Sequence, residues 1–222
     1  MFQIDSYISK LIDLLKINFD ERLIYVGLQG SYLRGEATEN SDIDIMVILD
    51  ELTVSDLKSY RSVIQCLGDF EKSCGFICSK SDLANWNPLE ICHVLNSTKD
   101  YYGALCDYIP SYTETDICNF IKVSVNNLYH EICHRYIHAD ENKSAARLHG
   151  SYKSVFFILQ NLMYLKFGKF AATKAELLAC LTGDDFAVLK RSMDYERGIS
   201  YDYQESFELL FRWCQKTLTS LS

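Results

Sequence analysis

Two short apolar segments limit what this chain can fold into. They are "RLIYVGLQG" (22–30) and "DIDIMVILD" (42–50), and both are rich in Ile, Leu and Val. Apolar runs of this length, bounded by turn-forming residues, are typical of buried β-strands. Apolar residues at helical spacing predict helices over 3–17 and 54–67, and "CGFICS" (74–79) predicts a third strand. The order helix, strand, loop, strand, helix, strand predicts a small α/β domain with a mixed sheet.

The pattern changes after Pro110. Before this residue, Ser81 is expected to cap a helix, with a break near Pro88. After it, strand signals end, and apolar stripes at helical spacing predict an all-α helical bundle. The predicted helices of this part cover 116–138, 147–167, 173–181 and 206–218. The sequence therefore predicts two domains, an α/β domain over 1–110 and a C-terminal helical bundle over 111–222.

The composition is that of an ordinary globular protein. Of the 222 residues, 48% are hydrophobic, and the formal net charge is −8. An acidic chain repels phosphates on average, so we expect no binding to duplex nucleic acid. Nine scattered cysteines without a C-x-x-C pair indicate reduced thiols in a cytoplasmic protein. We expect no membrane association, because no run reaches the ~20 apolar residues of a membrane span and no signal-peptide pattern is present.

Two aspartates interrupt the second apolar segment. Side chains two residues apart on a strand point to the same face, so Asp42 and Asp44 are expected to converge, while Ile43, Ile45 and Val47 face the core. Adjacent carboxylates repel each other unless a cation lies between them. Mg²⁺ prefers hard oxygen ligands of this kind and usually binds substrate phosphates as well. The pair therefore predicts a Mg²⁺ site for nucleoside triphosphate chemistry.

Ten residues separate a Gly-Ser pair from the first of these aspartates. Gly30 ends the first strand and lets the backbone approach a ligand closely. Ser31 opens a turn whose N–H groups and hydroxyl are suited to phosphate oxygens. Arg34, three residues on, is expected on the same side of a helical turn, where it adds positive charge. We therefore expect a phosphate-binding turn beside the metal site.

"GSYLRGEATENSDID" (30–44) resembles the signature of the nucleotidyltransferase superfamily that includes DNA polymerase beta: Gly-Ser, ten residues, then Asp-x-Asp. The Arg-Gly pair and Ser41 are similar to the aminoglycoside, lincosamide and minimal nucleotidyltransferases. This close resemblance covers 23–50. A weaker resemblance over 147–178 is to the C-terminal domain of the antibiotic-modifying enzymes. There a Lys near a helix start faces the triphosphate, and Lys153 is the candidate here.

The resemblance implies transfer of a nucleoside monophosphate. A hydroxyl of a small molecule would attack the α-phosphate of ATP, or of another nucleoside triphosphate, and pyrophosphate would leave. Asp42 and Asp44 would be catalytic and would hold Mg²⁺. The candidates for nucleotide binding are Gly30, Ser31, Arg34, Ser41 and Lys153. The implied acceptor is similar to an aminoglycoside or a lincosamide, and both a monomer and a homodimer stay open.

The sequence departs from this family on the third strand. Active members usually carry a third carboxylate there, whereas the corresponding position falls on Cys74 or Gly75. Asp69 and Glu71 lie nearby, on the approach to the strand. Glu131 is the candidate general base, because the antibiotic-modifying members are similar in drawing a carboxylate from their second domain. The alternative is a nucleotide-binding regulator or antitoxin-like protein with weak or no transferase activity.

A histidine-rich segment allows a different interpretation. "HEICH" (130–134) matches the zinc-binding pattern H-E-x-x-H, and His130, His134 and His138 recur at helical spacing. A zinc hydrolase would leave the Gly-Ser and Asp-x-Asp unit unexplained. We expect instead that these histidines pack at the domain interface or line the acceptor cleft.

Overall fold

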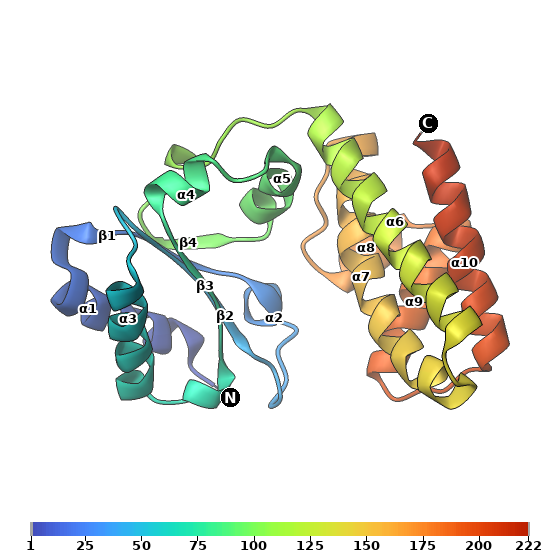
Figure 1. The fold of residues 1–222 in the computed structure, drawn as a ribbon, viewed down its shortest axis with the longest axis horizontal. Helices are drawn as coiled ribbons and strands as arrows, with labels where there is room; N and C mark the ends of the chain where they lie inside the picture. Colours follow the sequence, from blue (N-terminus) through green and yellow to red (C-terminus); the bar gives the residue numbers. More distant parts are fainter. Residues whose placement is uncertain (1, 222) are drawn as a thin grey trace. The chain divides into compact units, whose positions relative to one another are not determined.

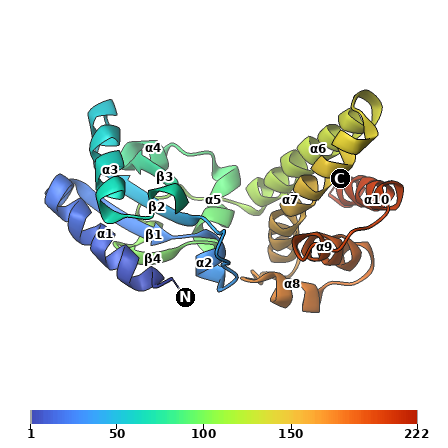
Figure 2. The ribbon, with the colours of Figure 1, turned by 90° about the horizontal axis from the view of Figure 1, so that it is seen from below.

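The computed structural model describes residues 2–221, except for the side chains of Glu141 and Asn142. The chain divides into two compact units, the first ending at Tyr112 and the second beginning at Thr113. Figures 1 and 2 show strands and helices in the first unit and helices in the second. This confirms the predicted fold class, an α/β domain with a small sheet followed by an all-α bundle.

A four-stranded mixed sheet forms the centre of the first unit. Its strands are β1 (Leu23–Leu28), β2 (Ile43–Leu49), β3 (Ser73–Ser79) and β4 (Lys99–Tyr102). They lie in the order β3-β2-β1-β4, with β1 antiparallel to β2 and β4, and β2 parallel to β3. The first three strands confirm the predicted ones. Because β2 and β3 are parallel, both strands begin at the same end of the sheet.

Helices connect these strands. They are α1 (Ile4–Phe19), α2 (Gly30–Arg34), α3 (Val54–Leu67), α4 (Lys80–Ala84) and α5 (Pro88–Asn96), with short 3-10 helices at Asp20–Arg22, Phe70–Lys72 and Leu105–Asp107. The helices predicted over 3–17 and 54–67 correspond to α1 and α3, and the turn expected after the Gly-Ser pair is α2.

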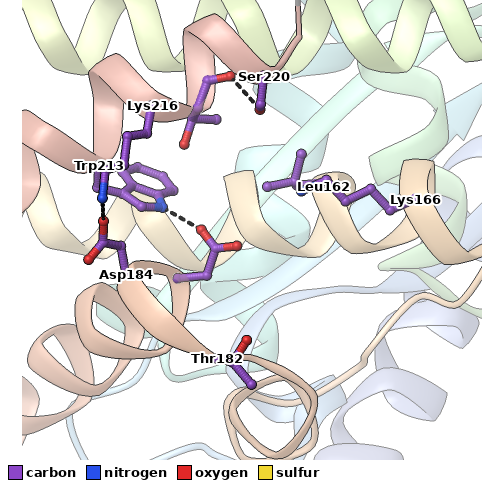
Figure 3. A pocket seen from close by; sticks show the side chains of 9 residues that line it. Leu162, Lys166, Thr182, Asp184, Trp213, Lys216 and Ser220 are labelled. Atoms are coloured by element: carbon purple, nitrogen blue, oxygen red, sulfur yellow. Dashed lines mark hydrogen bonds and ion pairs between the residues drawn. The ribbon is translucent and has the colours of Figure 1, made fainter.

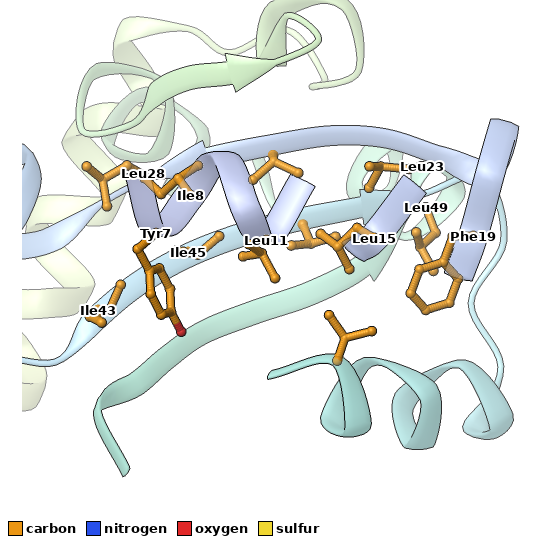
Figure 4. Close-up of a cluster of buried hydrophobic side chains, with 13 residues drawn as sticks. Tyr7, Ile8, Leu11, Leu15, Phe19, Leu23, Leu28, Ile43, Ile45 and Leu49 are labelled. Atoms are coloured by element: carbon orange, nitrogen blue, oxygen red, sulfur yellow. The ribbon is translucent and has the colours of Figure 1, made fainter. Parts of the chain in front are cut away.

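Both faces of the two central strands, β1 and β2, are buried. On one face, side chains of α1 such as Leu11 point towards β1 and β2, together with Val63 of α3 (Figure 4). On the other face, Met46 and Ile48 of β2 pack in a second cluster with Leu83 of α4. Complete burial of one such side chain contributes about 1.5–3 kcal/mol. This packing on both sides holds β2, and the acidic residues at its start, in a fixed position.

The predicted start of the helix after β3 is wrong by two residues. Ser79 is the N-cap: its hydroxyl accepts a hydrogen bond from the Asp82 N–H at 3.0 Å, and the Asp82 carboxylate accepts one from the Ser79 N–H at 2.9 Å. Ser79 has the extended backbone that a cap requires, whereas Ser81 already lies inside α4. The break predicted near Pro88 falls just before it, and Pro88 starts α5 with Asn87 as its cap.

The second unit is a bundle of helices. They are α6 (Glu114–His138), α7 (Glu141–Phe167), α8 (Lys174–Cys180), α9 (Gly183–Glu196) and α10 (Tyr203–Ser220). Four of them correspond to the predicted helices, and α9 is additional. Buried polar groups join them: the Tyr152 hydroxyl donates to the Ser206 carbonyl oxygen at 2.7 Å, and Arg191 donates to the Ser206 hydroxyl at 2.6 Å. Along residues 2–221, no helix combines the length and the apolar character needed to cross a bilayer.

Candidate active site

Asp44 lies against the backbone of the Gly-Ser pair. It is the second residue of β2, and the Gln29 N–H donates to its carbonyl oxygen at 2.9 Å. Gly30 has φ of +70°, and a Cβ built on it would overlap the Asp44 carboxylate, at 2.7 Å from its Cγ. Residues other than glycine rarely adopt this φ. Glycine is therefore required at position 30 for two reasons: the backbone has a positive φ, and the Asp44 carboxylate occupies the space that a Cβ would need.

The charges of Asp42 and Asp44 act on each other. Asp42 directly precedes β2 and is exposed, whereas Asp44 is half-buried. Burial raises the pKa of the Asp44 carboxyl, and the negative charge of Asp42 raises it further. Ile43, Ile45 and Val47 lie in the core cluster with α1, which confirms the predicted core-facing side of the strand. The structure thus brings two carboxylates within electrostatic range, beside Gly30.

The other predicted residues of this unit lie in α2 and in the loop between α2 and β2. Arg34 ends α2; its Nε donates to Glu36 Oε2 at 2.9 Å, and its charge partly offsets the rise in the Asp44 pKa. The Ser41 hydroxyl accepts a hydrogen bond from the Thr38 N–H at 2.8 Å, so this side chain braces the loop. Ser31, the second residue of α2, is partly exposed.

Cys74 faces Asp44 from the neighbouring strand. The parallel register pairs the two residues directly, and the Cys74 thiol donates a hydrogen bond to the Asp44 carboxylate. Gly75 has φ of +107°, and a Cβ on it would be 2.7 Å from the carbonyl carbon of Ile45. Because position 75 has no room for a side chain, Cys74 is the one of the two candidate positions on β3 whose side chain can face Asp44.

The two acids before β3 do not replace it. Glu71 lies exposed in the 3-10 helix Phe70–Lys72, and Asp69 precedes that helix with φ of +53°. Neither is a residue of β3, whose sequence SCGFICS contains no carboxylate. The strand therefore begins too late for Glu71 to point inward from it.

Two polar groups beside the site were not predicted. Burial lowers the pKa of His93 on α5 to about 4, with a smaller contribution from the charge of Arg34, so this imidazole is neutral at pH 7. The side-chain amide of Gln29 donates to Thr98 Oγ1 at 2.8 Å. His93 and Thr98 approach α2 only through the fold, and no motif in the sequence marks them.

The remaining predicted residues belong to the second unit. Glu131 on α6 forms an ion pair with Arg135 and accepts a hydrogen bond from the Ser151 hydroxyl at 2.7 Å. Lys153 is exposed on α7. The roles proposed for Glu131 and Lys153 remain predictions. Glu131 is held by two neighbours, which fixes its side chain.

The acidic pair fits a divalent cation that brings further ligands with it. Among the described residues, no three His, Cys, Asp or Glu side chains are arranged to hold a metal ion. Mg²⁺ is commonly bound by one or two carboxylates, with waters and substrate phosphates completing its octahedral shell. Asp42 and Asp44 supply such hard oxygen donors, and a cation would relieve the repulsion between them.

A cavity of about 270 Å³ lies in the second unit, between α7, α9 and α10 (Figure 3). Four of the side chains that line it pair with one another. Trp213 Nε1 donates to Asp185 Oδ1 at 2.7 Å, and Lys216 forms an ion pair with Asp184. None of the predicted site residues lines this cavity, so we assign it no part in the candidate site.

Known proteins resemble both the sequence and the fold. Residues 8–101 match the family described as "Nucleotidyltransferase domain". Over 42 residues, 19% of the chain, the sequence is 50% identical to the Methanocaldococcus jannaschii protein MJ1379, named as a candidate protein adenylyltransferase. This match spans 42% of that relative's length.

The fold resembles that of a solved adenyltransferase. The structure of spectinomycin adenyltransferase AAD(9) from Enterococcus faecialis with ATP and spectinomycin superposes with a TM-score of 0.62. The match covers 97% of this chain and 99% of that one, at 15% identity. The likeness extends over both units, and at this identity it concerns the fold. Residues 8–101, which include Gly30, Asp42 and Asp44, therefore form a nucleotidyltransferase domain.

Proposed function

We propose that the protein transfers AMP from ATP to a hydroxyl group of a small molecule. The observation that carries this proposal is the position of Asp44: its carboxylate lies against Gly30, and the negative charge of Asp42 acts on it. Acids of this kind next to a glycine turn suit a magnesium-bound triphosphate. In the reaction, the acceptor oxygen bonds to the α-phosphorus, the bond from that phosphorus to the bridging oxygen breaks, and pyrophosphate leaves.

The chain's own residues would position the reactants. Asp42 and Asp44 would hold Mg²⁺, which neutralises charge on the phosphates when it is bound. Ser31 and Arg34 would bind phosphate oxygens, and Ser41 would act by bracing the loop that it caps. Lys153 would add positive charge near the triphosphate.

The proton of the acceptor hydroxyl needs a base. The place facing Asp44 on β3 holds Cys74, whose thiol is engaged as a donor to Asp44. We assign the role to Glu131 of the second unit, because its carboxylate is held by Arg135 and Ser151. A held carboxylate loses little entropy when it orients a hydroxyl.

The fold supports a small acceptor. AAD(9), whose structure holds ATP and spectinomycin, resembles this chain over nearly its whole length. We therefore propose a polyhydroxylated compound of the aminoglycoside, aminocyclitol or lincosamide kind as the acceptor, which would make the protein an antibiotic-modifying enzyme.

A second candidate is transfer of AMP to a protein. The segment 50% identical to MJ1379 favours it, because that relative is named as a candidate protein adenylyltransferase. Cys74 in place of a third acid also favours slow turnover, and a regulator that binds nucleotide without turning it over is the limiting case.

Pyrophosphate release tests these proposals. The purified protein is incubated with ATP, Mg²⁺ and a panel of aminoglycosides, spectinomycin and lincosamides. We expect release that requires one acceptor and falls roughly 100-fold or more in Asp44→Asn. Asp69→Asn is the matched control, since it also removes one carboxylate and Asn tolerates the positive φ at that position. Transfer of labelled AMP to protein without any small acceptor would favour the second candidate, and equal rates in both variants would reject the site.

A further inference from the structure

The exposed face of α6 carries three histidines in series. His130, His134 and His138 lie four residues apart and are exposed. Their rings lie beside one another: the ring centroids of His130 and His134 are 6.0 Å apart, and those of His134 and His138 are 4.9 Å apart. The proposed transferase reaction uses none of the three, so this row needs an account of its own.

These separations suit two imidazoles that share one ion. With a metal–nitrogen distance of about 2.0–2.1 Å and an angle near 90–110°, the ring centroids stand roughly 4.5–5.3 Å apart. The pair His134 and His138 already has this separation. The pair His130 and His134 needs a closure of about 1 Å, which exposed side chains achieve by rotation about χ1 and χ2.

There is open space beside the row. A cavity of about 350 Å³ is lined by Tyr129, His130, Cys133 and His134. An ion held by two imidazoles keeps other coordination positions, which water or a small ligand fills. Arg135, the cation nearest in sequence, is paired with Glu131, so its charge is compensated.

We propose that α6 binds a divalent cation of the imidazole-preferring class, Zn²⁺, Ni²⁺ or Cu²⁺, through His134 together with His130 or His138. Imidazole suits these ions, whereas Mg²⁺ prefers carboxylate, carbonyl and water oxygens. The site has two protein ligands, in agreement with the lack of a three-ligand cluster among the described side chains. It joins adjacent turns of one helix and shares no ligand with the pair Asp42 and Asp44.

Calorimetric titration of the tag-free full-length protein with Ni²⁺ tests this proposal, because Ni²⁺ binds imidazole without oxidising the thiols. We expect His134→Ala to weaken binding at least tenfold, since it belongs to both pairs. The double variant His130→Ala/His138→Ala, which leaves His134 alone, should lose as much. Each of the two single variants should lose about threefold or less, because one pair remains.

Two controls define the site. His149→Ala removes a histidine of α7 that stacks on Tyr195 at 3.9 Å and should leave Ni²⁺ affinity unchanged. Cys133→Ser should also bind as the wild type does, since the ligands are imidazoles. In parallel, Ni²⁺ should raise the melting temperature of the wild type and not that of His134→Ala. Wild-type affinity in His134→Ala or in the double variant, or a loss in Cys133→Ser, would overturn the proposal.

Discussion

At the scale of the residue, the position of the Asp44 carboxylate explains why glycine occurs at position 30. The positive φ and the carboxylate both exclude a side chain there. The acid in turn depends on this glycine, because its own position is fixed by β2. A side chain at position 30 would therefore have to displace the Asp44 carboxylate.

Gly30→Ala is expected to displace the Asp44 carboxylate and to destabilise the fold by about 1–3 kcal/mol, through strain at positive φ and the overlap with Asp44. Gly150→Ala is the matched control: Gly150 lies in α7 with open space around its Cβ position, so alanine should stabilise by roughly 0.5–1 kcal/mol. Urea unfolding of both variants measures the difference. Equal stability of Gly30→Ala and wild type would show that the Asp44 carboxylate does not lie against position 30.

The thiol opposite Asp44 leads to a second expectation. Cys74→Asp places three carboxylates together, so the metal-free protein should lose roughly 1 kcal/mol through like-charge repulsion. Mg²⁺ should then raise the melting temperature of this variant by more than that of wild type, because it offsets a larger repulsion.

Cys74→Asn is the control for size and polarity without charge. It should show no gain in Mg²⁺ response. If Cys74→Asp and Cys74→Asn respond alike to Mg²⁺, position 74 does not face the metal site.

At the scale of the element, side-chain caps mark the starts of α3, α4 and α5. Thr53 and Asp56 form a capping box at the start of α3, and Arg22 donates to both oxygens of Asp56 at 2.9 and 3.0 Å. Arg22 follows α1 and also bonds to Asp50, at the end of β2. Through its bonds to Asp56 and Asp50, Arg22 therefore joins the start of α3 to the ends of α1 and β2.

Asp56 should make the stability of the fold sensitive to acid. The hydrogen bonds from Arg22 and then from Thr53 hold the pKa of Asp56 well below its usual range. Because the folded pKa lies below the unfolded one, the stabilisation is present above about pH 4 and is lost as the pH falls towards the folded value.

Asp56→Asn should therefore be less stable than wild type at pH 7, and this difference should shrink between pH 4 and pH 2. Urea unfolding across this range checks it, with the exposed Asp13→Asn as the control. A difference that stays constant with pH would contradict the assignment to the charged form.

The sequence pattern predicts the strands and helices whose buried residues are mostly apolar. Strands β1 to β3 and helices α1 and α3 follow from short apolar runs and helical spacing. The strand β4 does not, because its four residues KDYY lie at the sheet edge with Lys99 and Asp100 exposed. The helix α9 is hidden as well, because it buries the polar side chains of Arg191 and Asp194, which form ion pairs, together with only two apolar ones, Val188 and Leu189.

The site shows the same division. Gly30, Asp42 and Asp44 are close in sequence, and their spacing on a turn and a strand predicts that they meet. The positions of Cys74 and His93 depend on which strands pair and on where α5 packs. Strand order is set by long-range contacts, so the sequence limits the third acid to position 74 or 75 and leaves the register to choose between them.

At the scale of the whole molecule, the residues proposed for the reaction come from both compact units. Asp42, Asp44 and the turn that begins at Gly30 belong to the first unit, and Glu131 and Lys153 belong to the second. The likeness to AAD(9) extends over both units, so the second unit is part of the shared fold.

Equilibrium binding of a non-hydrolysable ATP analogue would show whether Asp44 holds a magnesium-bound triphosphate, because this binding depends neither on the acceptor nor on the base. Wild type and Asp69→Asn should bind the analogue about equally in Mg²⁺ and much more weakly when Mg²⁺ is chelated. Asp44→Asn should bind it at least tenfold more weakly in Mg²⁺ and show little response to chelation. Binding by Asp44→Asn that matches wild type, with the same dependence on Mg²⁺, would contradict the account.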